Sequence, residues 1–379
     1  MKKRLLPLLL VIMILLSGPV FGQEFDTKAG VAALLDADTG QFLYLKNADE
    51  QRPPASITKV MTLLLAFEAL DAGEINWEDT VTVSERAWRM GGSKMWLPLG
   101  ENVLVEDIIK GISIVSANDG CIAIAEYLAG SEEAFVQRMN ERARELGLTK
   151  TVFKNSTGWP AEGHLMSARD IAVLSRHLIT NHPRILEIES ETEFTFNDIK
   201  QENRNPLLGR FPNADGLKTG WTPESGYSLA GTALQNGMRL ISVVLNTESE
   251  DERLVASQEL LNYGFRNFER ITAVQSGDSI EEVPVKHGRE RTVNVVAAGD
   301  VPVTVPTGQE GSIELVVADR QELVAPVEKG TPAGTLLIQL DGETLATAPL
   351  ETAEDVGRAN IFVRIFRGIA DFFRGLLGR

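Results

Sequence analysis

An apolar stretch that begins directly after Lys59 constrains this chain more than any other feature. Nearly every position from Val60 to Leu70 carries an apolar side chain. A helix that is apolar all round has no face to give to water, so it has to lie at the centre of its domain. Two prolines precede the stretch and Gly73 follows it, which predicts a helix over residues 57–72. The rest of the fold is therefore expected to pack around this helix.

Ser56 and Lys59 stand at the entrance to this helix, and their spacing places both side chains on one face. Desolvation lowers the pKa of a buried ammonium group, and a neutral lysine can take a proton from a neighbouring hydroxyl. The pair is thus a candidate for a serine nucleophile activated by a lysine. Taken alone, an S-x-x-K tetrapeptide is more often a helix N-terminus with a solvent-exposed lysine.

Composition narrows the class of protein. With 43% hydrophobic residues, the chain can bury a large core. Its length of 379 residues predicts two or more domains. The formal charge of −16 argues against a nucleic-acid partner, because such a partner needs a basic surface patch. The single cysteine, Cys121, lies among apolar neighbours and is predicted to be buried. The four histidines lack the spacing of metal ligands, so we expect neither a metal site nor a cofactor.

The N-terminus has the features of a cleavable export signal. Lys2, Lys3 and Arg4 precede a short apolar run, and small residues follow it up to Gly22. The apolar run is too short to span a membrane comfortably. We therefore expect residues 1–22 to be a signal peptide and the mature chain to work outside the cytoplasm; an uncleaved anchor is the alternative.

Strand patterns stand at both ends of residues 29–264, and helical patterns lie mostly between them. Two hairpin signals, Asp38-Thr39-Gly40 and Asn236-Gly237, each separate a pair of apolar runs. This order predicts an α+β domain over residues 23–268, with one antiparallel sheet built from both ends of the segment and helices packed on it. Within it, residues 77–101 are expected to be rich in loops.

Two further segments follow this domain. Short alternating strands punctuated by Gly and Pro predict a small all-β domain over residues 269–353, with no obvious catalytic set. Residues 354–379 form a basic amphipathic pattern in which apolar and charged side chains occupy opposite helix faces. A helix of this kind lies well in an anionic membrane interface, which we favour over docking on the protein's own core.

Three short motifs occur in order along the chain: Ser56-x-x-Lys59, Ser116-Ala117-Asn118 and Lys218-Thr219-Gly220. Together they form the set shared by penicillin-binding proteins and serine β-lactamases. With the Pro-Ala-Ser-Ile-Thr-Lys stretch, the Gly91-Gly92-Ser93 loop and Asn203-Arg204-Asn205, the chain resembles the low-molecular-weight penicillin-binding proteins, and more narrowly the D-alanyl-D-alanine carboxypeptidases. Ala117 departs from the β-lactamase version of the second motif, which has Asp there.

The resemblance implies acyl transfer on a penicillin-binding, β-lactamase-like transpeptidase fold. Ser56 is expected to attack the carbonyl between two terminal D-alanines, with Lys59 as its base. Ser116 is expected to relay a proton to the leaving amine, helped by Lys218 and positioned by Asn118. The alternatives are that Ser116 caps the next helix, that Asn118 only shapes the turn and that Lys218 is solvated.

The resemblance also implies a substrate-binding set. The backbone N–H groups of Ser56 and Trp221 would form the oxyanion hole. Thr219 and Arg204 would hold the terminal carboxylate, with Arg253 a weaker candidate for the same task. Gly220 and Ser93, from the neighbouring motifs, complete the expected set of substrate-binding residues.

The expected substrate is a peptidoglycan stem pentapeptide ending in D-Ala-D-Ala, and β-lactams would acylate the same serine. The enzyme would work in the periplasm or on the outer face of the cytoplasmic membrane, held there by its C-terminal helix. A D,D-endopeptidase and a serine β-lactamase are the alternatives on the same fold. β-Lactamases of the S-D-N type use a deacylating glutamate in an E-x-x-x-N loop between the second and third motifs, and we expect no such pattern between Asn118 and Lys218.

Overall fold

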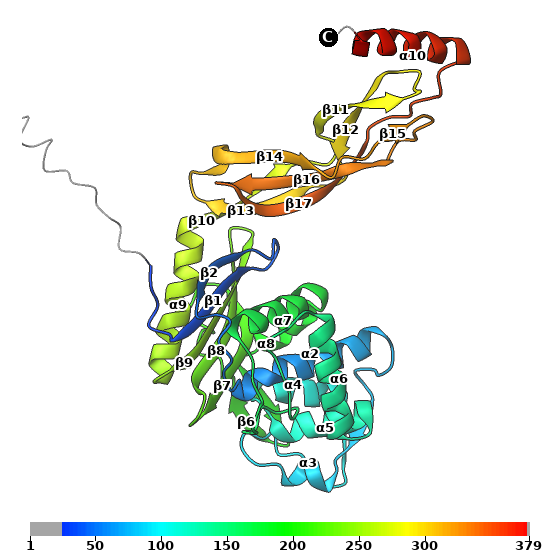
Figure 1. The fold of residues 1–379 in the computed structure, drawn as a ribbon. Coiled ribbons are helices and arrows are strands. Elements are labelled where there is room, and N and C mark those ends of the chain that lie inside the picture. Colours follow the sequence, from blue (N-terminus) through cyan, green and yellow to red (C-terminus); the bar gives the residue numbers. More distant parts are fainter. Residues whose placement is uncertain (1–24, 377–379) are drawn as a thin grey trace, which may run out of the picture.

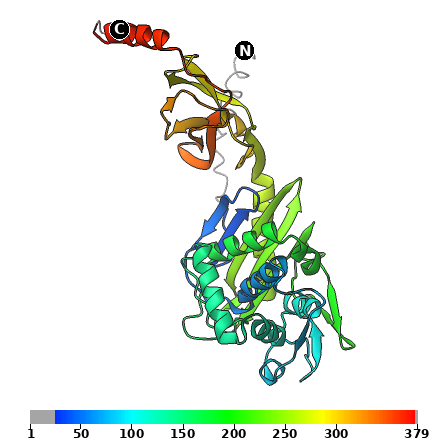
Figure 2. The same cartoon turned by 90° about the vertical axis from the view of Figure 1, so that its right-hand side faces the viewer.

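The chain has an elongated shape with a larger domain at one end, a small β domain beyond it and a single helix at the far end (Figures 1 and 2). The computed structural model describes residues 25–376. The expected signal peptide, residues 1–22, lies outside the described residues.

The main sheet of the larger domain has five antiparallel strands. Its first strand pairs with a strand from the far end of the domain, with Val31 opposite Leu245. This pairing confirms the predicted sheet built from the two ends of the segment. The strand order is β2 (Phe42–Lys46), β1 (Val31–Asp36), β9 (Met238–Thr247), β8 (Gly226–Gln235) and β7 (Ala214–Thr222), which leaves β7 at an edge.

Helices cover both faces of this sheet (Figure 1). Helix α9 (Glu250–Asn267) packs on one face through Leu260 and Leu261, which share a buried cluster with Leu240 of β9. The other face carries the main core and most of the helices. These are α2 (Lys59–Asp71), α4 (Val105–Ile114), α5 (Asn118–Ala129), α6 (Glu132–Glu145), α7 (Ala168–Asn181) and α8 (Arg184–Glu189).

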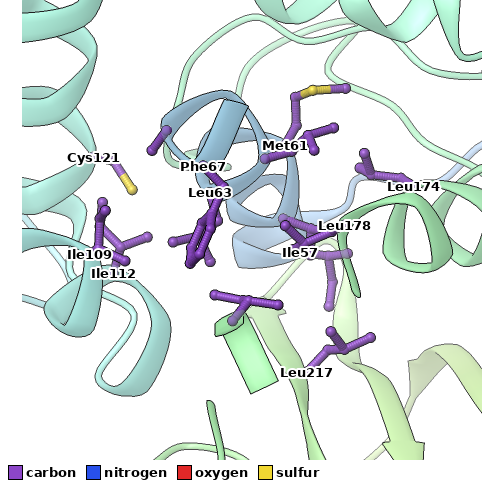
Figure 3. Close-up of a cluster of buried hydrophobic side chains, with 14 of the residues drawn as sticks. Ile57, Met61, Leu63, Phe67, Ile109, Ile112, Cys121, Leu174, Leu178 and Leu217 are labelled. Atoms are coloured by element: carbon purple, nitrogen blue, oxygen red, sulfur yellow. The ribbon is translucent and has the colours of Figure 1, made fainter. Parts of the chain in front are cut away.

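Helix α2 is the centre of that core, as its apolar sequence predicts. Met61 points to one side of the helix, Leu63 and Phe67 lie together on another, and all three belong to the same buried cluster as side chains of other elements (Figure 3). Cys121 lies in the same cluster and is fully buried. The predicted α-helical start is wrong in one detail: the chain from Ala55 to Thr58 forms a 3₁₀ turn, η1, and the α-helix begins at Lys59.

Two parts of this domain contain more regular structure than expected. The stretch predicted to be loop-rich holds β3 (Thr80–Thr82) and α3 (Glu85–Arg89), and β4 (Asn102–Leu104) pairs with β3 just after it. Helix α8 and a small hairpin, β5 (Glu193–Phe196) with β6 (Ile199–Glu202), lie between α7 and the sheet strands. These elements are too short to give a clear periodicity.

The small domain after α9 is built from short strands around a valine-rich core. A two-stranded sheet joins β10 (Phe268–Val274) to β13 (Val301–Pro306). A larger sheet has the order β14 (Ile313–Ala318), β16 (Pro332–Leu340), β17 (Glu343–Thr352), β12 (Thr292–Ala297), β11 (Ser279–Lys286) and β15 (Leu323–Val324). One short 3₁₀ turn, η2 (Glu310–Ser312), precedes β14.

The turn that follows β1 contacts the small β domain through hydrogen bonds. The buried carboxylate of Asp36 accepts a hydrogen bond from Thr304 Oγ1 at 2.7 Å. The Gln41 side chain forms two hydrogen bonds with the backbone of the same threonine. It donates to the carbonyl oxygen at 3.0 Å and accepts from the N–H at 2.6 Å. Arg270 and Asp38 form an ion pair beside them. Such a polar, interlocked contact fixes the β domain on the sheet.

Helix α10 (Ile361–Leu376) ends the described chain, at the end of the molecule remote from the larger domain (Figure 1). The Arg367 guanidinium donates to the carbonyl oxygens of Gly288 and Arg289, which attaches the helix to the β domain. Several apolar side chains in its first half are exposed, with Phe362 81% and Phe366 75% accessible. Within residues 25–376, every helix is either too short or too polar to cross a membrane.

Candidate active site

The first motif forms a direct contact between serine and lysine. Lys59 Nζ lies 2.9 Å from Ser56 Oγ and donates at 2.7 Å to the carbonyl oxygen of Thr157. The 3₁₀ turn brings Ser56 to the surface of the core, while Lys59 is fully buried. Burial lowers the pKa of the Lys59 ammonium group to about 8. The pair can therefore exchange a proton near neutral pH.

The loop that presents Thr157 packs backbone against backbone on η1. Asn155 Oδ1 accepts hydrogen bonds from the N–H groups of Thr157, Gly158 and Trp159 and so holds the loop in a tight turn. Gly158 has a φ of +83°, and a Cβ there would lie 1.8 Å from Ala55 O. Only glycine fits both requirements.

The second motif connects α4 to α5 in a strained turn. Ser116 has a φ of +63°, which is unusual for a residue with a side chain, and its buried Oγ has no hydrogen-bond partner. Asn118 donates through Nδ2 to Gly91 O at 2.8 Å, and its N–H donates to Ser93 O. Ser116 does not cap the next helix, because α5 begins at Asn118 without a side-chain cap.

Asp119, the next residue, anchors the loop opposite. Its carboxylate accepts from the N–H groups of Met95, Trp96 and Leu97. Together with Asn118, it ties the loop at residues 91–97 to the start of α5. This residue was not predicted as part of the site, and its position directly after the second motif was the only available signal.

The third motif lies on the edge strand β7, against η1. Lys218 is buried, and burial together with the positive charge of Lys59 lowers its pKa to about 7. Gly220 is needed at the contact, because a Cβ there would lie 2.8 Å from Pro54 O and 3.1 Å from Ile57 Cγ1. Because Lys218 is buried, the alternative that its side chain is solvated is wrong.

A buried carboxyl group, Glu189, also belongs to this environment and was missed. It is 1% exposed, and burial raises its pKa to about 8, against the opposing effect of the Lys218 charge. A Cβ at Gly216 would lie 2.6 Å from Glu189 Oε2, so the strand passes directly over this carboxyl. Glu189 stands in a run of alternating glutamates, and nothing in the sequence distinguishes it from Glu187 or Glu191.

These stretches meet at one cleft of about 370 Å³. Eight of the eleven predicted site residues line it: Ser56, Ser93, Ser116, Arg204, Thr219, Gly220, Trp221 and Arg253. The other three lie behind this lining, with Lys59 bonded to Ser56, Asn118 two residues from Ser116 and Lys218 beside Thr219. Tyr227 and Glu250 complete the lining and were not predicted.

Two arginines, Arg204 and Arg253, line the cleft. Arg204 is exposed, and its backbone N–H is fixed to Ile114 O. Arg253 is 5% exposed, with its guanidinium carbon 5.7 Å from the centre of the Tyr227 ring and its Nε without a hydrogen-bond partner. Glu250 is its ion-pair partner at 3.9 Å. Guanidinium groups in the lining suit a substrate that carries a carboxylate.

The expectation of no E-x-x-x-N pattern between the second and third motifs is wrong, because the spacing occurs once, at Glu193 and Asn197. Both residues are exposed in the β5–β6 hairpin, and Glu193 is paired with Lys200 at 2.5 Å. Neither lines the cleft. The glutamate that deacylates S-D-N β-lactamases therefore has no counterpart in this stretch.

The family described as D-alanyl-D-alanine carboxypeptidase matches residues 20–249. The chain belongs to that family. Residues 268–358 match a second family, the C-terminal domain of penicillin-binding protein 5. These matches confirm the predicted family, the penicillin-binding fold with its C-terminal β domain, and the class of serine-type carboxypeptidase.

Individual family members resemble this chain over most of its length. The D-alanyl-D-alanine carboxypeptidase DacF of Bacillus subtilis is 36% identical, over 98% of this chain and 99% of its own. Penicillin-binding protein 5 of Haemophilus influenzae has a solved structure with a TM-score of 0.82 and 37% identity, covering 89% of this chain and 100% of its own. Penicillin-binding protein D2 of Listeria monocytogenes, solved in an ampicillin-bound form, has a TM-score of 0.59 and 32% identity, covering 64% of this chain and 100% of its own.

Proposed function

We propose that this carboxypeptidase removes the terminal D-alanine from peptidoglycan stem pentapeptides through an acyl-enzyme on Ser56. The observation that carries the proposal is the 2.9 Å contact between Lys59 Nζ and Ser56 Oγ, made by a lysine with a pKa of about 8. A neutral Lys59 takes the Ser56 proton as Oγ forms a bond to the carbonyl carbon. The backbone N–H groups of Ser56 and Trp221 stabilise the resulting oxyanion.

Collapse of this intermediate breaks the C–N bond to the terminal D-alanine. Ser116, whose Oγ is free of other hydrogen bonds, passes a proton to the leaving amine, with Lys218 behind it and Asn118 holding the turn. Thr219 and Arg204 hold the carboxylate of the departing residue, and Arg253 adds charge to the same end. Water then hydrolyses the ester and restores Ser56.

Release of D-alanine from an acetylated Lys-D-Ala-D-Ala peptide tests this activity. We expect one D-alanine per peptide, together with slow turnover of penicillin, because the β-lactam ring opens on Ser56 to give a similar ester. The Listeria protein that binds ampicillin supports the second part. Rapid penicillin turnover without peptide cleavage would instead identify a β-lactamase, and cleavage of cross-linked dimers would identify an endopeptidase.

We further propose that the chain is exported, that residues 1–22 are its signal peptide and that it works in the periplasm or at the outer face of the membrane. Under this proposal, residues 23–268 form the catalytic unit, residues 269–353 form the β domain and residues 354–379 form the membrane anchor. Cell fractionation and the N-terminal sequence of the mature protein test the export step. A cytoplasmic protein that begins at Met1 would contradict it.

Support for the anchor comes from α10 and the surface beneath it. The exposed Phe362 and Phe366 present apolar rings that an interfacial helix buries in the lipid boundary. A hollow of about 420 Å³ beside the helix is lined by cations, Lys286, Arg291, Arg364 and Arg367 among them. Cations at this level favour an anionic lipid surface.

A further inference from the structure

A second hollow, of about 400 Å³, continues the active-site cleft along both segments that form it. On η1, Ser56 lines the cleft, while the preceding Ala55 lines the second hollow. On β7, Trp221 lines the cleft, while Thr222 lines the second hollow. A ligand that extends past Ser56 along the edge strand therefore enters this hollow, here called the side hollow.

An extended peptide substrate is long enough to reach the side hollow. With its C-terminal carboxylate near Thr219 and its scissile carbonyl near Ser56, an extended peptide beside β7 advances about 3.3 Å per residue. Because the proposed oxyanion hole holds the scissile carbonyl at the N–H of Trp221, the next residue upstream, about 3.3 Å further along, lies level with Thr222. An edge strand offers a free row of backbone groups for such pairing. The third residue from the C-terminus thus lies at the entrance to the side hollow.

The chemistry of the side hollow differs from that of the cleft. The charged residues that line it are Glu162 and Glu224, both exposed, and neither forms an ion pair in the described part of the chain. The ring of Trp159 and the prolines beside it supply apolar surface. The cleft, by contrast, carries Arg204 and Arg253. The two hollows therefore suit the opposite ends of a zwitterionic peptide.

A buried group in the side hollow also lacks a partner. His164 is 3% exposed, and its Nε2 is bonded to Thr58 Oγ1 at 2.9 Å. Its Nδ1 has no hydrogen-bond partner among residues 25–376, although the residue lines the side hollow. A buried nitrogen in this state is costly unless a ligand or water completes it. This is the second observation, besides the two carboxylates, that points to a polar ligand.

We propose that the side hollow binds the amino-bearing side chain of the diamino acid that precedes the two D-alanines. The hydrocarbon part of that side chain packs against Trp159 and the prolines, and its ammonium group lies between Glu162 and Glu224. This inference rests on the proposed function, because the direction of the peptide follows from the carboxylate site. It makes the free amino group of an uncross-linked stem peptide a feature that the enzyme recognises.

One nearby cation offers a test in the opposite direction. Lys154 passes close to the rim, since its Cε would lie 3.3 Å from a Cβ placed on Gly163. Its positive charge opposes the binding of an ammonium group. Neutralising Lys154 should therefore strengthen the recognition that neutralising either glutamate weakens.

The experiment compares kcat/KM for D-alanine release from two peptides, Nα-acetyl-Lys-D-Ala-D-Ala and its Nα,Nε-diacetyl form. The wild-type enzyme is expected to favour the free amine. Glu162→Gln and Glu224→Gln should each reduce the preference about two- to fivefold, mainly through KM, as expected for exposed ion pairs. Lys154→Gln should raise it by a similar factor. Asp198→Asn, a matched charge change in the β5–β6 turn, should leave it unchanged.

Raised ionic strength should lower the preference of the wild-type enzyme, since exposed charges are screened. Equal kcat/KM for both peptides in the wild-type enzyme would overturn the inference while leaving the carboxypeptidase intact. A preference that survives in both glutamate variants would also overturn it. If neither peptide releases D-alanine, the proposed function itself fails, so the two failures are distinguishable.

Discussion

The burial of Lys59 predicts a steep pH dependence for acylation of Ser56. With a pKa of about 8, half of the Lys59 side chains are neutral at pH 8 and roughly 1% at pH 6. Only the neutral amine can take the serine proton, so the rate rises with pH. We therefore expect the acylation rate constant to fall roughly 50-fold from pH 8 to pH 6, and about tenfold for each further unit.

The assay is the rate of labelling by a fluorescent penicillin, measured under single-turnover conditions from pH 5 to pH 9. Circular dichroism over the same range checks that the fold persists. Lys59→Arg is the informative control, because a guanidinium group stays charged throughout and cannot act as the base. Acylation that is flat between pH 6 and pH 8, or that falls as the pH rises, would refute the assignment of Lys59.

Other consequences of the structure can be measured more simply. Arg204→Ala should raise KM for the peptide at least tenfold with little loss of thermal stability, because this exposed side chain lines the cleft and is proposed to hold the substrate carboxylate; an unchanged KM in steady-state assays would contradict this role. Leu63→Ala should lower the free energy of unfolding by about 2–5 kcal/mol in urea titrations, because the side chain is fully buried; a loss below about 1 kcal/mol would contradict the central position of α2. Replacing Phe362 and Phe366 by Ala together should move the chain from sedimented anionic vesicles to the supernatant without changing D-alanine release; continued sedimentation would exclude α10 as the anchor.

Much of the fold followed from local pattern in the sequence. The apolar α2 had to be central, and the Asn236-Gly237 pair had to turn a hairpin, as the positive φ of both residues confirms. The spacing of Ser56 and Lys59 placed both on one face, and the two later motifs favoured a contact between them over a solvent-exposed lysine. Where a signal depends on periodicity over many residues, or on a turn of fixed chemistry, the sequence carries it directly.

What the sequence did not reveal depends on contacts between distant segments. Thr157 holds Lys59 through its backbone carbonyl, so its side chain gave no signal. Glu189 became notable only when α8 placed it under β7, beside Lys218. The side hollow also arises from tertiary packing, since its lining comes from residues 53–55, the loop at residues 158–165, the end of β7 and Glu224 just after it.

Mass spectrometry after incubation with penicillin tests the central claim most directly. We expect a single adduct per chain, which maps to the peptide that contains Ser56 and disappears in Ser56→Ala. Circular dichroism of the variant should match that of the wild type. An adduct on Ser116 or on another serine, or one that persists in Ser56→Ala, would contradict the assignment of Ser56 as the nucleophile.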